Sequence, residues 1–307
     1  MMKSVTGLIV LGVCLILLPI RADAESMPIW PEDSPELEGV QPEHMPKLNL
    51  FHGEPSDQPK PAVLILPAGG YKHHSNMHRY IKFLNELGFA AYEVKYRLPV
   101  HGYKHPAPLN DAQRSMRIIR HNAKEWGIDP ERVGVLGMSS GGHLTSTLIT
   151  HFDSGDEKAK DPIQKHSCRP AYAMMIDSVV TMQGKFCHRP SRDRLLPKNP
   201  PQELVDELSN ELQVTPDTPP TFLMHGGQDQ LVPAENSLMF FTALRKNNVA
   251  FSELHFHAHG GHFFTQQDFE TPAKAWLEKL GVIGNLHQDE RAKKSLTNPA
   301  AWGNDNK

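Results

Sequence analysis

The sequence has few cysteines, no excess of charge of one sign and few aromatic side chains. Three cysteines in 307 residues are too few for the disulfide scaffold of a small secreted domain. The 32 Lys and Arg residues nearly balance 35 Asp and Glu residues, which leaves a formal net charge of −3. This balance argues against nucleic acid or an anionic membrane as a partner. Hydrophobic residues still make up 39 % of the chain, enough for a globular core.

Long hydrophobic runs are confined to the N-terminus. Lys3 precedes an apolar stretch over residues 7–20, and the small residues Ala22 and Ala24 follow where a signal peptidase reads them. The stretch is shorter than the roughly 20 residues that a spanning helix needs. We therefore predict a cleavable signal peptide over residues 1–24 rather than an uncleaved anchor, and a secreted or periplasmic protein without membrane contact.

Cleavage at this position would remove one cysteine and leave a pair. Cys168 and Cys187 would then meet an oxidising compartment, where an even pair commonly forms a disulfide. We predict a Cys168–Cys187 disulfide, with two buried thiols as the alternative.

From Pro61 onward, short apolar runs alternate with amphipathic helical patterns. This alternation predicts an α/β fold with a mostly parallel central sheet and helices on both faces. Strands are predicted at residues 47–51, 63–66, 89–96, 132–136, 172–176, 221–224 and 251–256, and helices at residues 78–87, 109–126, 143–150, 235–246 and 272–280. No repeat or linker divides the chain, so we predict one domain over residues 25–284 and a polar tail over 285–307. Prolines and charges at 181–212 interrupt the pattern and predict an insertion near the mouth of a site.

A Gly-x-Ser-x-Gly motif joins one predicted strand to the next helix. Gly137, Ser139 and Gly141 form it, and its setting is typical of a sharp turn that raises a serine above the sheet. Glycines are needed there because larger side chains would collide with the strand and helix. Ser139 is therefore the predicted nucleophile, and the backbone N–H of Ser140 is a predicted oxyanion donor.

A histidine and a carboxylate follow the last two predicted strands. His262 comes after the two glycines at 260–261, which would let the loop swing over the sheet edge. Asp229 would fix the imidazole tautomer and stabilise the imidazolium. Ser, Asp and His follow one another along the chain in the order expected for an α/β fold with such a serine turn. Asp177 also follows a strand and is an alternative acid.

A glycine-containing loop follows the strand at 63–66. Gly69 and Gly70 lie there, where backbone N–H groups could face the developing negative charge of a tetrahedral intermediate. We predict an oxyanion hole from Gly70, Gly69 and Ser140; an ordinary glycine turn is the alternative.

Two groups of histidines could suggest other sites. The first group alternates along one predicted strand and its end: His255, His257 and His259. Their imidazoles could ligate zinc from one strand face, but no carboxylate or cysteine pattern accompanies them. We therefore predict no metal and no cofactor. Three further histidines flank the predicted oxyanion loop and could line a substrate pocket or lie on the surface: His73, His74 and His78.

Together these stretches resemble a known group of enzymes. The likeness is carried by residues 28–31, 67–71, 96–99, 126–143, 225–233 and 260–262. The chain resembles secreted bacterial α/β-hydrolases of the acetylxylan esterase and feruloyl esterase-like type, and more distantly hormone-sensitive lipase-like and dienelactone hydrolase-like enzymes. The resemblance implies the α/β-hydrolase fold and a cofactor-free serine ester hydrolase. Such an enzyme would remove acetyl or other small acyl groups from plant or algal polysaccharides such as xylan, through an acyl-enzyme.

The chain departs from these relatives at two points. Ala68 stands where the first of three glycines is usual, which leaves both donor positions free. Phe263 replaces a more usual glycine after the predicted base, and with Phe264 it is predicted to narrow the acyl pocket and favour acetyl.

Two other functions share these motifs. A prolyl-oligopeptidase-type serine peptidase is disfavoured because only about 35 residues precede the core, where such enzymes carry a propeller. A non-catalytic glycan-binding relative is disfavoured because Ser139, Asp229 and His262 are all present, and fold alone cannot decide between them.

Overall fold

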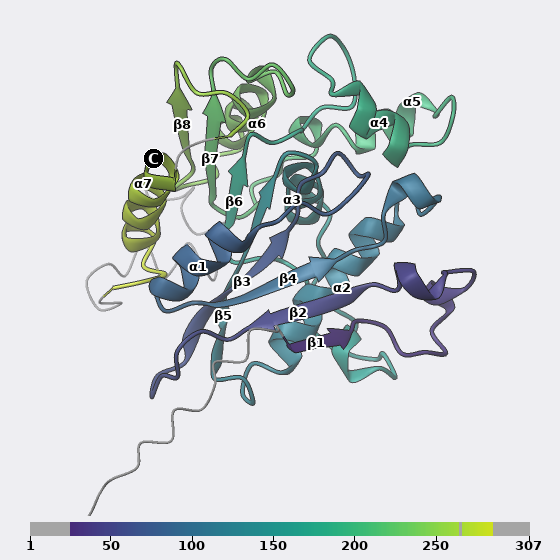
Figure 1. Ribbon diagram of the computed structural model, residues 1–307, viewed down its shortest axis with the longest axis vertical. Coiled ribbons are helices and arrows are strands. Elements are labelled where there is room, and N and C mark those ends of the chain that lie inside the picture. Colours follow the sequence, from purple (N-terminus) through teal and green to yellow (C-terminus); the bar gives the residue numbers. More distant parts are fainter. Residues whose placement is uncertain (1–24, 264–265, 285–307) are drawn as a thin grey trace, which may run out of the picture.

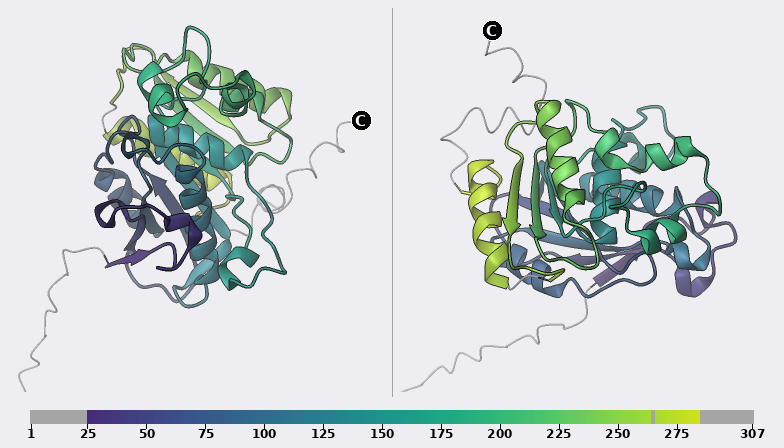
Figure 2. Two further views of the ribbon diagram at one scale, coloured as in Figure 1. Left: turned by 90° about the vertical axis from the view of Figure 1, so that its right-hand side faces the viewer. Right: turned by 90° about the horizontal axis from the view of Figure 1, so that it is seen from above.

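The computed structural model describes residues 25–263 and 266–284, which form one twisted sheet with helices on both faces (Figures 1 and 2). The strands are β1 (Glu25–Pro28), β2 (Lys47–Phe51), β3 (Lys60–Leu66), β4 (Ala90–Lys95), β5 (Ile128–Met138), β6 (Ala173–Ile176), β7 (Thr221–Gly226) and β8 (Glu253–His257). The α-helices are α1 (His78–Glu86), α2 (Ala107–His121), α3 (Ser140–Thr150), α4 (Arg189–Leu195), α5 (Gln202–Glu207), α6 (Glu235–Lys246) and α7 (Gln266–Lys279). Five short 3₁₀ helices occur in the described ranges: η1 (Pro35–Leu37), η2 (Pro42–His44), η3 (Pro99–His101), η4 (Pro162–Lys165) and η5 (Asn210–Leu212).

The sheet has the strand order β1-β2-β4-β3-β5-β6-β7-β8. Neighbours from β4 to β8 pair in parallel, while β2 is antiparallel to both β4 and β1. All seven residues of β3 are buried, as expected for a strand covered on both faces. The predicted mostly parallel sheet is confirmed. Its parallel strands end at the same edge of the twisted sheet, and β6, β7 and β8 point toward the top of Figure 1.

The two faces of the sheet carry separate hydrophobic clusters. Met116 of α2, Leu144 of α3 and Phe240 of α6 belong to one cluster. Leu84 of α1 and Trp276 of α7 belong to the other. The helices therefore form two layers around the sheet (Figure 2), which fixes the positions of the strand ends.

The N-terminal segment is tied to the sheet by a buried polar network. The indole Nε1 of Trp30 donates to Asp111 Oδ1 at 2.7 Å. Arg97, which follows β4, donates to the same carboxylate through Nη2 at 2.7 Å and lies 3.5 Å from Glu36. Asp111 is fully buried, so this ion pair holds the proline-rich segment against α2.

Several predicted boundaries differ from those observed. The helix predicted over 109–126 ends at His121, because residues after it turn toward β5. The helix predicted over 272–280 begins earlier, at Gln266, so that Pro272 lies inside α7. The interruption at 181–212 forms α4, α5 and η5, none of which the sequence predicted.

The predicted disulfide is wrong. Cys168 and Cys187 are both free and buried. Cys168 lies before β6 and its N–H donates to Asp153 O at 3.1 Å, whereas Cys187 follows β6 in the insertion. The two thiols are therefore at opposite ends of that strand. Burial raises the pKa of Cys168 to about 11, so this thiol stays protonated at neutral pH.

The predicted signal peptide, residues 1–24, and the predicted tail, residues 285–307, lie outside the described residues. Among the helices of residues 25–263 and 266–284, none has the length and apolarity needed to cross a bilayer.

Candidate active site

Ser139 lies at the tip of a strained turn between β5 and α3. Its φ of 55° and ψ of −120° are unusual for any residue with a side chain. The Ser139 N–H donates to Ile176 O at 3.0 Å, and the Ser139 carbonyl accepts from Val179 N at 3.1 Å. The turn is thus fixed by β6, at the carboxyl edge of the sheet. Backbone strain held in this way is typical of a nucleophile elbow.

The glycines of this turn allow two close approaches. A Cβ on Gly141 would lie 2.1 Å from Leu66 O, and a Cβ on Gly137 would lie 2.2 Å from Thr145 Oγ1. Both distances are far below van der Waals contact, so the structure confirms why glycine is needed at these positions.

His262 and Asp229 form a short, buried hydrogen bond. His262 Nδ1 lies 2.6 Å from Asp229 Oδ2, and the two side chains are 9 % and 0 % exposed. Asp229 Oδ1 also accepts from Leu231 N and Val232 N at 2.8 and 2.9 Å. Burial alone would raise the pKa of Asp229, but the hydrogen bonds from His225, His262 and Val232 outweigh it and hold that pKa well below its usual range. An ionised Asp229 keeps the proton on Nδ1 and leaves Nε2 of His262 as the basic atom.

A second histidine supports the same carboxylate. His225, at the end of β7, is fully buried, and its Nε2 lies 3.0 Å from Val232 O and 3.4 Å from Asp229 Oδ2. Its Nδ1 lies 2.7 Å from Ser237 Oγ. Because Nε2 faces two acceptors, we assign the proton to it. The residue pattern did not predict this role of His225. The sequence signal for it is that His225 precedes Asp229 by four residues.

The loop that carries His262 passes directly over Gly226. A Cβ on Gly226 would lie 2.3 Å from Gly261 O, whereas a Cβ on Gly261 would meet nothing within 4 Å. The Gln228 N–H donates to Gly260 O at 2.9 Å. The steric requirement here therefore falls on Gly226, beneath the loop, while the freedom predicted for residues 260–261 stays a prediction.

Ser139 and the His262–Asp229 pair share the carboxyl edge of the sheet without a direct hydrogen bond. Within the described part of the chain, none joins Ser139 Oγ to His262. Such bonds are often long in ligand-free enzymes and tighten with substrate. The three-residue triad therefore stays a prediction, and the structure shows the contact between His262 and Asp229 that it requires.

The predicted oxyanion loop is compact and tethered. Gly69 and Gly70 have φ values of 126° and 62°, and a Cβ on Gly69 would lie 2.0 Å from His73 O. Arg194 Nη1 donates to Gly70 O at 2.8 Å. Within the described residues, the Gly70 N–H makes no backbone hydrogen bond, and Ser140 opens α3 with an N–H that has no intrahelical partner. Both donors suit an oxyanion, although their convergence on one point stays a prediction.

A buried tyrosine and histidine connect this loop to the rest of the site. Tyr71 Oη lies 2.8 Å from His143 Nδ1, and His143 Nε2 lies 2.9 Å from Leu208 O. Burial lowers the pKa of His143 to about 4, so its ring is neutral at pH 7. The oxyanion loop, α3 and the insertion are thereby joined by one neutral network.

The histidines flanking the loop differ from one another. His74 is largely buried, its Nε2 lies 3.0 Å from Tyr96 O, and burial lowers its pKa to about 4. His73 and His78 are exposed. His74 therefore packs against the residues beside the loop, whereas His73 and His78 lie on the surface, as one of the two predictions had it.

Asp177 lies beside the acid rather than replacing it. It follows β6, is fully buried, and its Oδ1 accepts from Gly226 N at 3.0 Å. Its Oδ2 has no hydrogen-bond partner in the described residues. Burial raises the pKa of Asp177 to about 6. The hydrogen bond to His262 is made by Asp229, so the geometry favours Asp229 as the acid.

Asp177, His225 and Asp229 have ligand atoms within 4.8 Å of one another and could in principle hold a metal ion. Both ring nitrogens of His225 already have protein partners, and Asp229 is bonded to His262. These bonds make the cluster a hydrogen-bond network around the acid.

The alternating histidines of β8 and the turn after it each lie beside a different side chain. Glu253 lies 3.0 Å from His255, Asp268 lies 4.0 Å from His257 and Gln228 lies 3.5 Å from His259.

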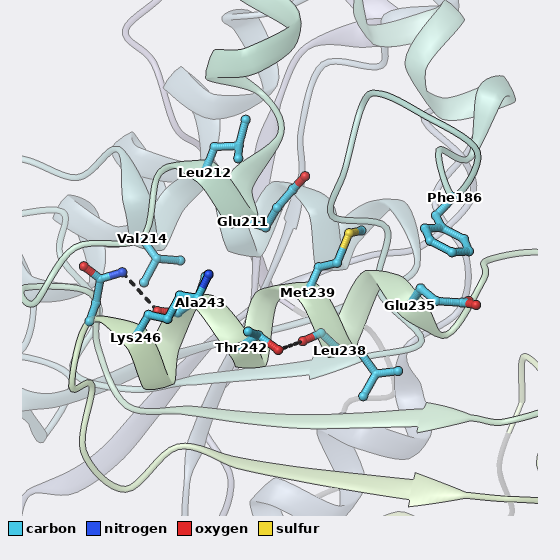
Figure 3. Close-up of a pocket in the computed structure, with 11 residues that line it drawn as sticks. Phe186, Glu211, Leu212, Val214, Glu235, Leu238, Met239, Thr242, Ala243 and Lys246 are labelled. Carbon is cyan, nitrogen blue, oxygen red and sulfur yellow. Dashed lines mark hydrogen bonds between the residues drawn. The ribbon is translucent and has the colours of Figure 1, made fainter.

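Several hollows surround these residues. One of about 410 Å³ lies beside the base and is lined by residues 257–261, Phe263 and Asp268. Phe263 is 72 % exposed and its ring centroid lies 5.2 Å from that of His262, while Phe264 lies outside the described residues. Another hollow, of about 550 Å³, is lined by α6, η5 and Phe186 and contains no triad residue (Figure 3).

Comparison with known proteins identifies relatives across most of the chain. A family model described as BD-FAE matches residues 48–244. The chain is 33 % identical over 213 residues to endo-1,4-beta-xylanase B of Butyrivibrio fibrisolvens, covering 66 % of this chain and 33 % of that protein. It is 31 % identical to an acetylxylan esterase of Xylanibacter ruminicola, covering 60 % of this chain and 37 % of the relative. The chain thus spans about a third of the length of these curated relatives.

A solved structure matches over nearly its whole length. The acetyl ester-xyloside bifunctional hydrolase from Caldicellulosiruptor lactoaceticus is 37 % identical, with a TM-score of 0.79 and coverage of 85 % of this chain and 98 % of that one. Together with the sheet order, this match confirms the predicted α/β-hydrolase fold.

Proposed function

Because the chain belongs to the BD-FAE family, we propose that it is a serine carboxylic ester hydrolase that removes acetyl or other small acyl groups from a polysaccharide such as xylan. The observation that carries the proposal is the buried 2.6 Å contact between Asp229 and His262, at the same sheet edge as the strained Ser139. The names of the relatives, an acetylxylan esterase and an acetyl ester-xyloside hydrolase, support the choice of acyl group and sugar.

The geometry supports a two-step mechanism through an acyl-enzyme. Ser139 Oγ attacks the ester carbonyl while His262 Nε2 accepts its proton. Asp229 stabilises the imidazolium that forms, and the amides of Gly70 and Ser140, with Gly69, face the negative charge of the tetrahedral intermediate. His262 then protonates the departing sugar hydroxyl. Water enters, gives its proton to His262 and releases the acid and free Ser139.

The proposed location is outside the cytoplasm. The signal-like residues 1–24 support export, and a polysaccharide substrate would be met there. A fractionation of the source cells, followed by N-terminal sequencing of the mature protein, tests this; a cytoplasmic protein that keeps Met1 would contradict it.

Hydrolysis of a short ester panel tests the proposed function. We expect the wild-type protein to cleave p-nitrophenyl acetate faster than the octanoate and to release acetate from acetylated xylan. Ser139→Ala should lower kcat by about 10⁴-fold or more without a large change in Tm. Ser146→Ala, which removes a buried hydroxyl farther along α3, is the matched control.

The same panel separates the alternative functions. If wild type and Ser139→Ala are equally inactive on every ester while the protein binds xylan, the glycan-binding alternative replaces the proposal. If only peptide substrates are cleaved, and Ser139→Ala abolishes that cleavage, the chain is a peptidase.

A further inference from the structure

The first half of the insertion is strongly basic in a protein that is slightly acidic overall. Residues 181–200 contain one carboxylate, Asp193, and five cationic side chains: Lys185, Arg189, Arg192, Arg194 and Lys198. The second half has the opposite character and contains Glu203, Asp206, Glu207 and Glu211. The insertion therefore presents two regions of opposite charge. Whether the basic region can affect substrate binding depends on how close it lies to the candidate active site.

The basic half contacts the predicted oxyanion loop directly, whereas the second half reaches it through Leu208 and the buried His143. Arg194 Nη1 donates to Gly70 O in the oxyanion loop at 2.8 Å. His188 lies just before α4. Burial lowers the pKa of His188, and the charge of the nearby His262 lowers it further. In Figure 1, α4 lies at the upper right of the molecule, to the right of the ends of β6 and β7. A polysaccharide with an ester at Ser139 would therefore pass near α4.

A hollow of about 480 Å³ opens at the C-terminal end of α4. It is lined by Lys104, Arg192, Asp193, Leu196, Pro197, Lys198, Asn199 and Pro200. Three of these side chains are cationic and one is a carboxylate. The hollow is thus a polar concavity with an excess of positive charge.

The cationic side chains that line this hollow have few carboxylate partners. Arg192 Nε is buried without a hydrogen-bond partner among the described residues, and its Nη1 lies 3.5 Å from Asp193, which is 68 % exposed. Among the described residues, Lys104 Nζ donates to the backbone carbonyls of Asp193, Arg194 and Leu196, so its N–H groups have acceptors but its charge has no carboxylate partner. Lys198 has no ion pair in the described ranges. Buried donors without acceptors are rare in proteins unless a ligand or water supplies the acceptor.

We propose that this hollow binds the carboxylate of an acidic sugar carried by the polysaccharide, so that the enzyme prefers acetyl esters close to uronic acid substituents. The planar guanidinium of Arg192 matches a carboxylate in geometry, and Lys104 and Lys198 add charge that attracts an anionic chain. The inference rests on the proposed function, because it assigns the substrate class of the same site.

The test compares acetylated xylo-oligosaccharides separated by anion exchange into a neutral fraction and a fraction that carries glucuronic acid. Acetate release gives kcat/KM for each fraction, and their ratio measures the preference. We expect wild type to favour the acidic fraction by about fivefold to tenfold at low salt, and the preference to shrink in 0.3 M NaCl. Arg192→Gln and Lys198→Gln should each bring the ratio toward one.

Arg245→Gln is the matched control, since it removes an exposed arginine on α6, away from the hollow. It should leave the ratio unchanged. Lys198 is exposed, so Lys198→Gln keeps the test valid if Arg192→Gln fails to fold. A melting curve of each variant shows whether it folds. A wild-type ratio near one, or a ratio that neither substitution changes, would overturn the inference and leave the esterase proposal intact. Absence of hydrolysis of every ester would instead overturn the proposed function, and this inference with it.

Discussion

At the scale of single residues, the least expected feature is the buried carboxyl of Asp177 next to the acid that holds His262. Burial raises its pKa to about 6, against the opposing effects of His225, the Gly226 N–H and His262, and Asp229 raises it further. The folded state therefore binds this proton more tightly than the unfolded chain does, where an aspartate titrates near 3.9. The stabilisation is fully present below that value and is lost as the pH rises through about 6.

Asp177→Asn should remove this pH dependence. Asn cannot ionise, and its Oδ1 can still accept from Gly226 N. We expect the variant to gain stability relative to wild type between pH 4 and pH 7, by up to about 3 kcal/mol for a shift of two pKa units. Urea unfolding at both pH values measures it, with the exposed Asp193→Asn as control. A difference that is the same at both pH values would mean that Asp177 titrates normally.

A second residue-scale prediction concerns two glycines of the site. Gly141→Ala would place a Cβ 2.1 Å from the β3 carbonyl of Leu66, while Gly261→Ala would meet nothing within 4 Å. We expect the first to lower the free energy of unfolding by about 3 kcal/mol or more and the second by less than about 1 kcal/mol. Equal losses in urea unfolding would show that the tight packing of β3 against α3 is relieved by movement.

At the scale of elements, the strands were predictable and the insertion was not. β3 and residues 133–138 of β5 are buried, so these stretches read as nearly continuous apolar runs. In α4 the buried residues are Ser191 and Leu195, four apart on one helix face, but one of them is polar, so the short helix shows no hydrophobic pattern in the sequence. The role of His225 was missed for another reason: its partners Val232 and Ser237 follow β7 closely in the chain, but no residue pattern marks a histidine that supports a carboxylate. Residue patterns predicted the positions of Ser139, Asp229 and His262, but not the side chains that hold them.

The tether between α4 and the oxyanion loop gives a prediction about catalysis. Arg194→Gln would remove the 2.8 Å hydrogen bond to Gly70 O and let the loop backbone reorient. Because oxyanion donors act only when preorganised, kcat for p-nitrophenyl acetate should fall about tenfold while KM changes little. Arg189→Gln is the control, since its hydrogen bond goes to Gly184 O within the insertion. An unchanged kcat would mean that the loop holds its conformation through Gly69 and Tyr71 alone.

At the scale of the whole molecule, the parallel sheet brings together residues that are far apart in the chain. The oxyanion loop follows β3, Ser139 follows β5, Asp229 follows β7 and His262 follows β8. Parallel pairing places all four connections at one edge, as expected for open α/β sheets. The site therefore depends on the sheet keeping its register, including the edge that β1 and β2 extend.

The buried network at that edge should be a major source of stability. Asp111 accepts from Trp30, Arg97 and the Arg97 backbone N–H, so it joins the N-terminal segment, the end of β4 and α2. Asp111→Asn would leave the Arg97 guanidinium buried without its counter-charge, and removing one partner of a buried pair costs about 3–5 kcal/mol. For a domain of this size that corresponds to a fall in Tm of about 10 °C. Asp129→Asn breaks the partly exposed pair with Arg132 and should cost less than about 1 kcal/mol. If both substitutions have the same small effect in calorimetry, the N-terminal segment is held by its apolar contacts, with Ile29 and Leu48 in the core, and the ion pair serves to orient it.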